Sequence, residues 1–142
     1  MYKHILIATD GSELADKAVA TGLALAKGLE TKVTAGTAIE PWLSIASSDT
    51  AAAFMEYQKA AERDAARILG KVGTTAKMHG VQCETITVTE TAAEAIIATA
   101  KSKQCDLIVM SSHGRRGLVR VLLGSQAMRV LTLSSDPVLI CR

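Results

Sequence analysis

The chain has 142 residues, of which 49% are hydrophobic and 21% are charged. This length and composition predict one folded domain over residues 1–142 and exclude disordered, fibrous and low-complexity chains. The apolar runs are much shorter than the ~20 residues that cross a bilayer, so no membrane partner is expected. The start of the chain lacks a secretory cleavage pattern, and we therefore expect a cytoplasmic protein.

The net charge of +2 is distributed unevenly. Residues 1–100 carry nine basic and twelve acidic side chains, whereas residues 101–142 carry seven basic and two acidic ones. Positive charge gathers around Arg115, Arg116, Arg120 and Arg129, which indicates either a solvated basic face or a site that attracts phosphate. Aromatic residues make up only 3% of the chain and offer no stacking platform, so no nucleic-acid partner is expected.

Cysteines and histidines form no metal-ligand pattern. The cysteines, Cys83, Cys105 and Cys141, lie in or beside apolar stretches and form no CxxC pair, which is typical of buried reduced thiols. The three histidines are far apart in the sequence. We therefore expect no protein-built metal site.

The first elements in the chain are a strand, a helix and a second strand. Residues 3–9 form an apolar, isoleucine-rich run that is typical of a strand buried on both faces. Ser12 is expected to cap a helix that ends near Gly28. Residues 32–39 predict the second strand.

A loop over residues 41–50, anchored by Trp42, precedes a second helix. Helical spacing starts at residue 51 and continues to about residue 69, with an extension to about residue 78 left open. One apolar stripe of this helix is expected to pack in the core: Phe54, Ala61, Ala65, Ile68 and Val72.

The second half of the chain continues the alternation. Residues 81–89 alternate in polarity and predict a strand near a sheet edge, followed by a helix that Thr91 and Glu94 start with a capping box. Residues 106–110 predict another fully buried strand. A glycine-bearing loop and a helix over 124–133 lead to a last strand at 137–141.

Strands and helices that alternate in this way predict a doubly wound α/β domain of three layers, with a parallel sheet between two layers of helices. Five strands and four helices are expected. Ligands of such sheets bind beyond the carboxyl ends of the strands, where the strand order reverses. The loops that follow the strands are therefore the candidates for function.

The loop after the fourth strand carries the strongest functional signal. Ser111, Ser112 and Gly114 are small and let a ligand approach the backbone closely. The N–H groups of Gly124 and Ser125, together with the Ser125 hydroxyl, are expected at the positive end of the last helix, which favours an anion. A loop whose glycines only permit turns is the plainer alternative. Neither common nucleotide fingerprint, GxxxxGK[ST] or GxGxxG, occurs in the chain.

These residues resemble the universal stress protein family. Its nucleotide-binding members carry G-x2-G-x9-G-[S/T] after the fourth strand, and this chain has Ser111-x2-Gly114-x9-Gly124-Ser125. Serine therefore stands where the family has its first glycine. The opening of the chain over residues 5–12 and its close over residues 137–140 also resemble the family's two ends.

The resemblance implies a strand order of 3-2-1-4-5 and an ATP cleft between the first and fourth strands. It places Ala8 and Ala38 beside the adenine, Asp10 beside the ribose, and the stretch from Met110 through Ser111 and His113 to Gly114 along the nucleoside and α-phosphate. The residues expected to hold the phosphates, with Mg²⁺ or Mn²⁺ bound through them, are Gly114, Gly124, Ser125 and Gln126.

The function that follows is an ATP-binding stress-response regulator, acting as a nucleotide-dependent switch or interaction module. AMP is the other nucleotide considered. No residue is assigned a catalytic role, and a slow ATPase or phosphotransferase is the enzymatic alternative. A nucleotide-free stress chaperone becomes the leading alternative if Ser111 blocks the cleft. The apolar last strand at 137–141, expected at a sheet edge, and the family resemblance together predict a homodimer.

Overall fold

The computed structural model describes residues 1–42, 50–114 and 123–142. Its strands and helices alternate along these residues, as the sequence predicts. The described elements are β1 (His4–Ala8), α1 (Glu13–Leu29), β2 (Lys32–Ile39), α2 (Ala51–Met78), β3 (Cys83–Thr89), α3 (Ala92–Ser102), β4 (Leu107–Ser111), α4 (Ser125–Leu133) and β5 (Val138–Cys141).

The described strands form a parallel sheet in the order β3-β2-β1-β4-β5. This arrangement confirms the predicted fold class and strand order. β1 and β4 are adjacent at the centre, where the order of winding reverses, and β3 and β5 are the two edges. Every residue of β4 is buried, as expected for a central strand covered on both faces.

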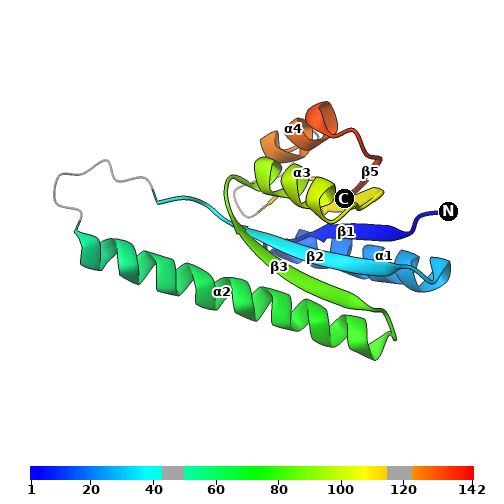
Figure 1. The fold of residues 1–142 in the computed structure, drawn as a ribbon, viewed down its shortest axis with the longest axis horizontal. Coiled ribbons are helices and arrows are strands. Elements are labelled where there is room, and N and C mark those ends of the chain that lie inside the picture. The colour runs from blue at the N-terminus through cyan, green and yellow to red at the C-terminus, as the bar shows by residue number, and fades with distance from the viewer. Residues whose placement is uncertain (43–49, 115–122) are drawn as a thin grey trace.

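Helices cover both faces of the sheet (Figure 1). On one face, α1 and α2 pack against side chains such as Ile7 and Val33, and on the other, α3 and α4 pack against Leu6 and Ile108. Neighbouring residues of β1 therefore point to opposite layers, as the pleat of a strand requires. None of the helices in the described ranges is long and apolar enough to cross a membrane.

The helix α2 is longer than the sheet face that it covers. Figure 1 shows it as a straight rod whose first turns extend past the rest of the molecule. Its first buried residue is Ala65, and Phe54 is 45% exposed. The prediction that Phe54 packs in the core is therefore wrong, because the buried face of α2 begins only at Ala65. Trp42 contacts this helix as expected, with its ring centroid 4.8 Å from that of Tyr57.

The predicted N-terminal cap is confirmed for α1 and is wrong for α3. The Ser12 hydroxyl accepts a hydrogen bond from the Ala15 N–H at 3.1 Å, which confirms it as the N-cap of α1. Thr91 makes no side-chain capping bond at α3, and Glu94 instead forms an ion pair with Arg129 of α4. The predicted capping box is therefore wrong, and another residue caps α3.

Two helices end at non-glycine residues in the left-handed region. The φ of Glu30, directly after α1, is 52°, and that of Gln104, beyond α3, is 55°. Gly28 lies one residue before the end of α1, which confirms the expected end of this helix. Side chains other than glycine are strained in this conformation, since Cβ approaches the backbone carbonyl.

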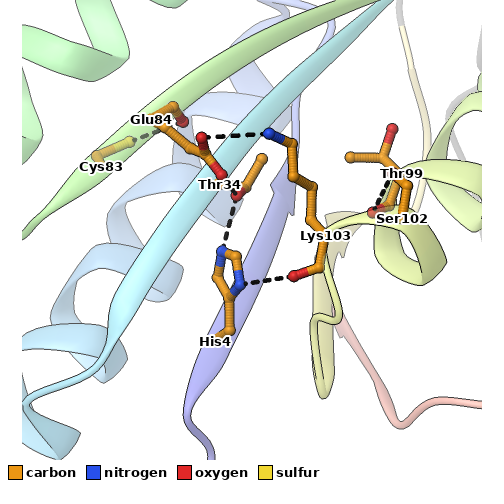
Figure 2. A network of polar contacts seen from close by, with 7 residues as sticks. All are labelled: His4, Thr34, Cys83, Glu84, Thr99, Ser102 and Lys103. Atoms are coloured by element: carbon orange, nitrogen blue, oxygen red, sulfur yellow. Dashed lines mark hydrogen bonds and ion pairs between the residues drawn. The ribbon is translucent and has the colours of Figure 1, made fainter.

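A chain of polar groups that runs from the buried His4 and Thr34 to the exposed Glu84 crosses three strands at the end of the sheet opposite the loops after β1 and β4 (Figure 2). The Nδ1–H group of His4 donates to the Lys103 carbonyl at 3.0 Å, and Nε2 lies 2.7 Å from the Thr34 hydroxyl. Thr34 also bonds to a carboxylate oxygen of Glu84 at 2.9 Å, and the Lys103 ammonium reaches the other oxygen at 3.3 Å. Strands β1, β2 and β3 are thus connected by side chains as well as by the backbone.

Burial governs the charge of His4 in this network. Loss of solvent and the nearby Lys32 ammonium lower the pKa of His4, and this outweighs the opposing effects of the Lys103 carbonyl, Glu84 and Asp106. The hydrogen bond from Thr34 and the Lys103 ammonium lower the pKa of Glu84. Burial thus opposes protonation of His4, whereas the contacts with Thr34 and Lys103 favour the ionised form of Glu84.

The three cysteines are free. Cys105 is buried, and desolvation raises its pKa to about 11. Burial also raises the pKa of Cys83. Cys105 is thus buried as the sequence predicts, whereas Cys83 and Cys141 are only half-buried.

Candidate functional site

A cavity of about 810 Å³ opens beyond the carboxyl ends of β1, β2 and β4. It lies at the point where the strand order reverses between β1 and β4, which is where doubly wound sheets bind ligands. Its volume falls in the range of small-molecule sites. All the site residues that the sequence predicts line this cavity: Ala8, Asp10, Ala38, Met110, Ser111, His113, Gly114, Gly124, Ser125 and Gln126.

The wall formed by the sheet includes several small side chains. Ala8 ends β1, and Gly36 and Ala38 lie near the end of β2. The start of α3 contributes Ala92 and Ala95 on the facing side. The sheet and the start of α3 therefore both contribute short apolar side chains to the cavity.

The loop after β1 contacts the loop after β4 through Asp10 and Gly114. A Cβ atom at position 114 would lie 2.6 Å from Oδ2 of Asp10, so the end of the Asp10 side chain would have to shift. The other carboxylate oxygen of Asp10 accepts a hydrogen bond from the Ser12 N–H at 2.9 Å. Glycine at position 114 therefore allows the carboxylate to lie beside the β4 loop while it is anchored to its own turn.

Ser111 adopts a conformation open to any residue. Its φ does not lie in the left-handed region, where Glu30 and Gln104 are the non-glycine residues of the described chain. The Ser111 hydroxyl donates to the His113 carbonyl at 2.8 Å, and the residue is 8% exposed. The side chain is thus bonded to its own loop, so the serine creates no backbone strain where the family has glycine.

A chain of backbone bonds fixes the start of α4. The Gly124 N–H donates to the Ser112 carbonyl at 2.8 Å, and the Ser112 N–H donates to the Cys141 carbonyl of β5, also at 2.8 Å. The expectation that the Gly124 N–H faces an anion is therefore wrong, because that donor is engaged within the loop. A Cβ on Gly124 would lie 3.0 Å from the Ser112 oxygen, so this close crossing favours glycine.

The first turn of α4 has N–H groups without an intrahelical partner. Gly124 occupies the N-cap position without a side-chain bond, and Ser125 and Gln126 are the first two helical residues. Their N–H groups precede the first possible intrahelical bond, the one that Met128 donates to the Gly124 carbonyl. The positive end of the helix thus faces the cavity wall that Gly124, Ser125 and Gln126 form.

His113 forms part of the same wall. Its Nδ1 lies 3.1 Å from the Ser112 hydroxyl, and no carboxylate among the described residues is bonded to the ring. This arrangement orients the imidazole through a neighbouring serine and lacks the acidic partner that a general base commonly has.

Sequence reasoning missed one side of the cavity. The residues that α2 supplies are Tyr57, Ala61, Asp64, Ala65 and Ile68. Glu40 also lines the cavity, and its carbonyl accepts a hydrogen bond from the Tyr57 hydroxyl at 2.7 Å. No local pattern in the sequence could reveal that α2 passes this end of the sheet.

The basic residues of the loop after β4 are only partly described. Arg115, Arg116 and Arg120 lie outside the described residues. Arg129 lies within α4 and pairs with Glu94. In the described ranges, no group of three or more histidine, cysteine or acidic residues is arranged to hold a metal ion.

The fold and the position of the cavity define a doubly wound α/β protein with a candidate ligand site at its switch point. The family model of the universal stress protein family matches residues 1–142. The chain belongs to the universal stress protein family.

Two curated relatives match the whole chain. Universal stress protein MJ0531 of Methanocaldococcus jannaschii is 33% identical over 144 residues, which cover 100% of this chain and 83% of that protein. Universal stress protein YxiE of Bacillus subtilis is 32% identical over 148 residues, which cover the full length of both chains.

Solved structures agree with the fold. The universal stress protein UspA from Lactobacillus plantarum superimposes with a TM-score of 0.85 at 20% identity, covering 99% of this chain and 98% of that chain. A universal stress protein in complex with cAMP matches with a TM-score of 0.76 at 27% identity, covering 99% of this chain and 97% of that chain.

Proposed function

We propose that this protein is a nucleotide-binding regulator that takes ATP into the cavity at the carboxyl ends of β1 and β4. The observation that carries the proposal is that residues from four separate segments, each expected from the sequence to contact a nucleotide, line one cavity. The related universal stress protein in complex with cAMP supports the choice of an adenine nucleotide.

The chemistry of the walls suggests how the nucleotide lies. The slot between Ala8, Gly36 and Ala38 fits the adenine, because small apolar side chains leave room for a planar ring. Asp10 is placed at the ribose, where a carboxylate accepts hydrogen bonds from hydroxyl groups. The phosphates extend to the first turn of α4, where free N–H groups and the helix dipole favour negative charge.

A divalent ion, Mg²⁺ or Mn²⁺, accompanies the phosphates in this proposal. The described residues provide no cluster of three or more metal-binding side chains, so the phosphate oxygens supply most of the ligands. The Ser125 hydroxyl is the protein group best placed to add one. The ion neutralises charge on the phosphate tail and needs no dedicated site of its own.

Regulation by binding fits the cavity better than catalysis. Phosphoryl transfer requires a group that deprotonates or orients the nucleophile. His113 lacks a bonded carboxylate among the described residues, and its Nδ1 is already engaged by Ser112. We therefore assign the nucleotide the role of stabilising one conformation of the protein. An interaction partner in the cytoplasm recognises that conformation.

A homodimer through β5 completes the proposal. β5 is an edge strand, and its Leu139 is 38% exposed although it is apolar. Leu131 and Leu133 of α4 are also exposed, at 40% and 53%. Apolar side chains at a sheet edge favour pairing with a second copy of the chain.

Isothermal titration of the purified protein with Mg-ATP tests the proposal. We expect saturable binding and a rise in the free energy of unfolding of about 2.7 kcal/mol at a free ligand concentration of about 100 times Kd. The same sample is expected to release no phosphate above a protein-free blank. Absence of binding heat at millimolar nucleotide, with no nucleotide released on denaturation, would contradict the proposal.

A further inference from the structure

The carboxamide of Gln126 connects the starts of two helices. Its Oε1 atom accepts a hydrogen bond from the Ala93 N–H at 2.8 Å, across 33 positions of the sequence. Ala93 is the second residue of α3, and Gln126 is the second residue of α4. The cap that Thr91 does not provide for α3 therefore comes from the neighbouring helix.

This bond fixes which end of the carboxamide faces Ala93. A backbone N–H can only donate, so the oxygen must face it, and the NH₂ group must occupy the other position. If the amide were turned over, two donors would face each other and the hydrogen bond would be lost. The orientation of the side chain is thus determined by α3.

The NH₂ group is left for a ligand. Gln126 is half-buried and lines the cavity. Its amide nitrogen donates to no described residue, whereas its oxygen is engaged. Around it, the first turn of α4 adds further backbone donors, and the Ser125 side chain supplies a hydroxyl. This wall of the cavity therefore presents hydrogen-bond donors next to a positive helix end.

We propose that Gln126 determines the selectivity of the cavity for the phosphate tail, by donating from its NH₂ group to a phosphate oxygen while its oxygen caps α3. The inference rests on the proposed nucleotide function and deepens it. A group that offers only hydrogen-bond donors favours the binding of an anion and disfavours the binding of a ligand that ends in a cation. Binding of the tail and the start of α3 are then linked through one side chain.

The variant Gln126→Glu separates the two roles of this residue. A carboxylate still accepts from the Ala93 N–H, and negative charge in the first turn of α4 is favourable for the helix dipole. The variant therefore keeps the cap and is expected to be as stable as the wild type. It replaces the NH₂ donor with an anion where a phosphate oxygen would lie.

The experiment measures the affinities of Mg-ATP and of adenosine for the wild type and for Q126E. We expect Q126E to reduce the affinity for Mg-ATP at least about tenfold, because it removes a donor to a charged acceptor and adds repulsion. The affinity for adenosine should stay within about twofold, since adenosine has no phosphate. Titration of ATP in EDTA should give the same loss, which excludes capture of Mg²⁺ by the new carboxylate.

A matched control and a second variant complete the design. Gln82→Glu adds the same charge at an exposed residue before β3, at the opposite end of the strands, and should leave both affinities unchanged. Gln126→Met has a similar length without hydrogen-bonding groups. It should lower both the stability and the affinity for Mg-ATP, with a smaller effect on affinity than Q126E.

The outcomes are distinct. Equal affinities of Q126E and the wild type for Mg-ATP would overturn the role of Gln126 and leave the proposed function standing. Parallel losses for adenosine and Mg-ATP would show that the residue acts only on the shape of the cavity, which also overturns the inference. If the wild type binds no Mg-ATP, the proposed function and the inference fail together.

Discussion

Gly114 lies so close to Asp10 that a methyl group at position 114 would be 2.6 Å from the carboxylate oxygen Oδ2. The two residues come from the loops after β1 and β4, which are 104 positions apart in the chain. Both residues line the cavity. Glycine at position 114 thus matters for the space that it leaves to the Asp10 side chain rather than for an unusual φ.

Gly114→Ala is expected to displace the Asp10 carboxylate and lower the affinity for Mg-ATP. Displacement breaks the bond to the Ser12 N–H, which costs about 1 kcal/mol of unfolding free energy. Urea denaturation and titration calorimetry measure the two effects. Gly28→Ala is the control, because nothing lies within 4 Å of its Cβ and it occupies a helix, where alanine is favoured over glycine. An unchanged G114A protein would refute the close contact.

Ser111→Gly restores the glycine of the family motif. Because the serine hydroxyl bonds to the His113 carbonyl and its φ is not left-handed, we expect the affinity for Mg-ATP to stay within about threefold. The free energy of unfolding should fall by about 1 kcal/mol with the loss of that hydrogen bond. A gain in affinity of more than about tenfold would mean that the serine side chain crowds the ligand.

Stability is expected to depend on pH through His4. Burial and Lys32 lower its pKa in the folded state below the value of 6.5, so the unfolded chain binds the proton more readily. The free energy of unfolding should therefore be highest above that value and decrease as the pH falls through 6.5 towards the folded pKa.

Chemical denaturation from about pH 8 to about pH 5 measures this dependence, in a range above the ordinary pKa of carboxylates. His4→Gln should flatten the slope, whatever its effect on overall stability. His79→Gln is the matched control, since His79 is exposed at the end of α2 and makes no side-chain contact in the network of Figure 2. The same slope in His4→Gln as in the wild type would exclude His4 as its source.

Leu139→Lys is expected to convert the proposed dimer into a monomer. The substitution places a charge on the exposed apolar edge of β5, where a second copy would pair. Light scattering gives the mass, and far-ultraviolet circular dichroism verifies the fold. Thr87→Lys, at an exposed position of the opposite edge strand β3, should leave the mass unchanged. A wild-type protein of monomeric mass would contradict the proposal directly.

Gln104→Gly is expected to stabilise the fold. The residue has a φ of 55°, which costs a non-glycine side chain roughly 1–2 kcal/mol. The greater freedom of glycine in the unfolded chain offsets part of this gain, so a net increase below about 1 kcal/mol should result. Thermal unfolding of Gln104→Gly and Gln104→Ala compares relief of strain with simple loss of the side chain. A lower melting temperature for the glycine variant would be inconsistent with the φ.

Much of the fold could be predicted because the patterns that specify it are local. The apolar run at 32–39 matches β2 to the residue, and the Ser12 cap works as expected. The cap of α3 could not be predicted, since it is formed by Gln126, 33 residues away. The local spacing of Thr91 and Glu94 predicted a capping box that does not form. Thr91 makes no capping bond, and Glu94 pairs with Arg129 of α4.

In the candidate site, the residues of the loops that follow the strands could be predicted from the sequence. The residues that α2 contributes to the cavity could not. Parallel topology alone brings the ends of β1, β2 and β4 to one edge. Whether Tyr57 and Asp64 line the cavity depends on the path of α2, which no repeat in the sequence specifies. Likewise, the engagement of the Gly124 N–H by Ser112 depends on a tertiary crossing.

The carbonyl of Cys141 determines which end of the chain tolerates truncation or a purification tag. It accepts a hydrogen bond from the Ser112 N–H, and the Ser112 carbonyl in turn accepts one from the Gly124 N–H at the start of α4. Trimming the chain before Cys141 therefore removes the outermost support of the loop that borders the cavity, although that residue is far from it in sequence. Purification handles belong at the amino end, where Met1 is fully exposed.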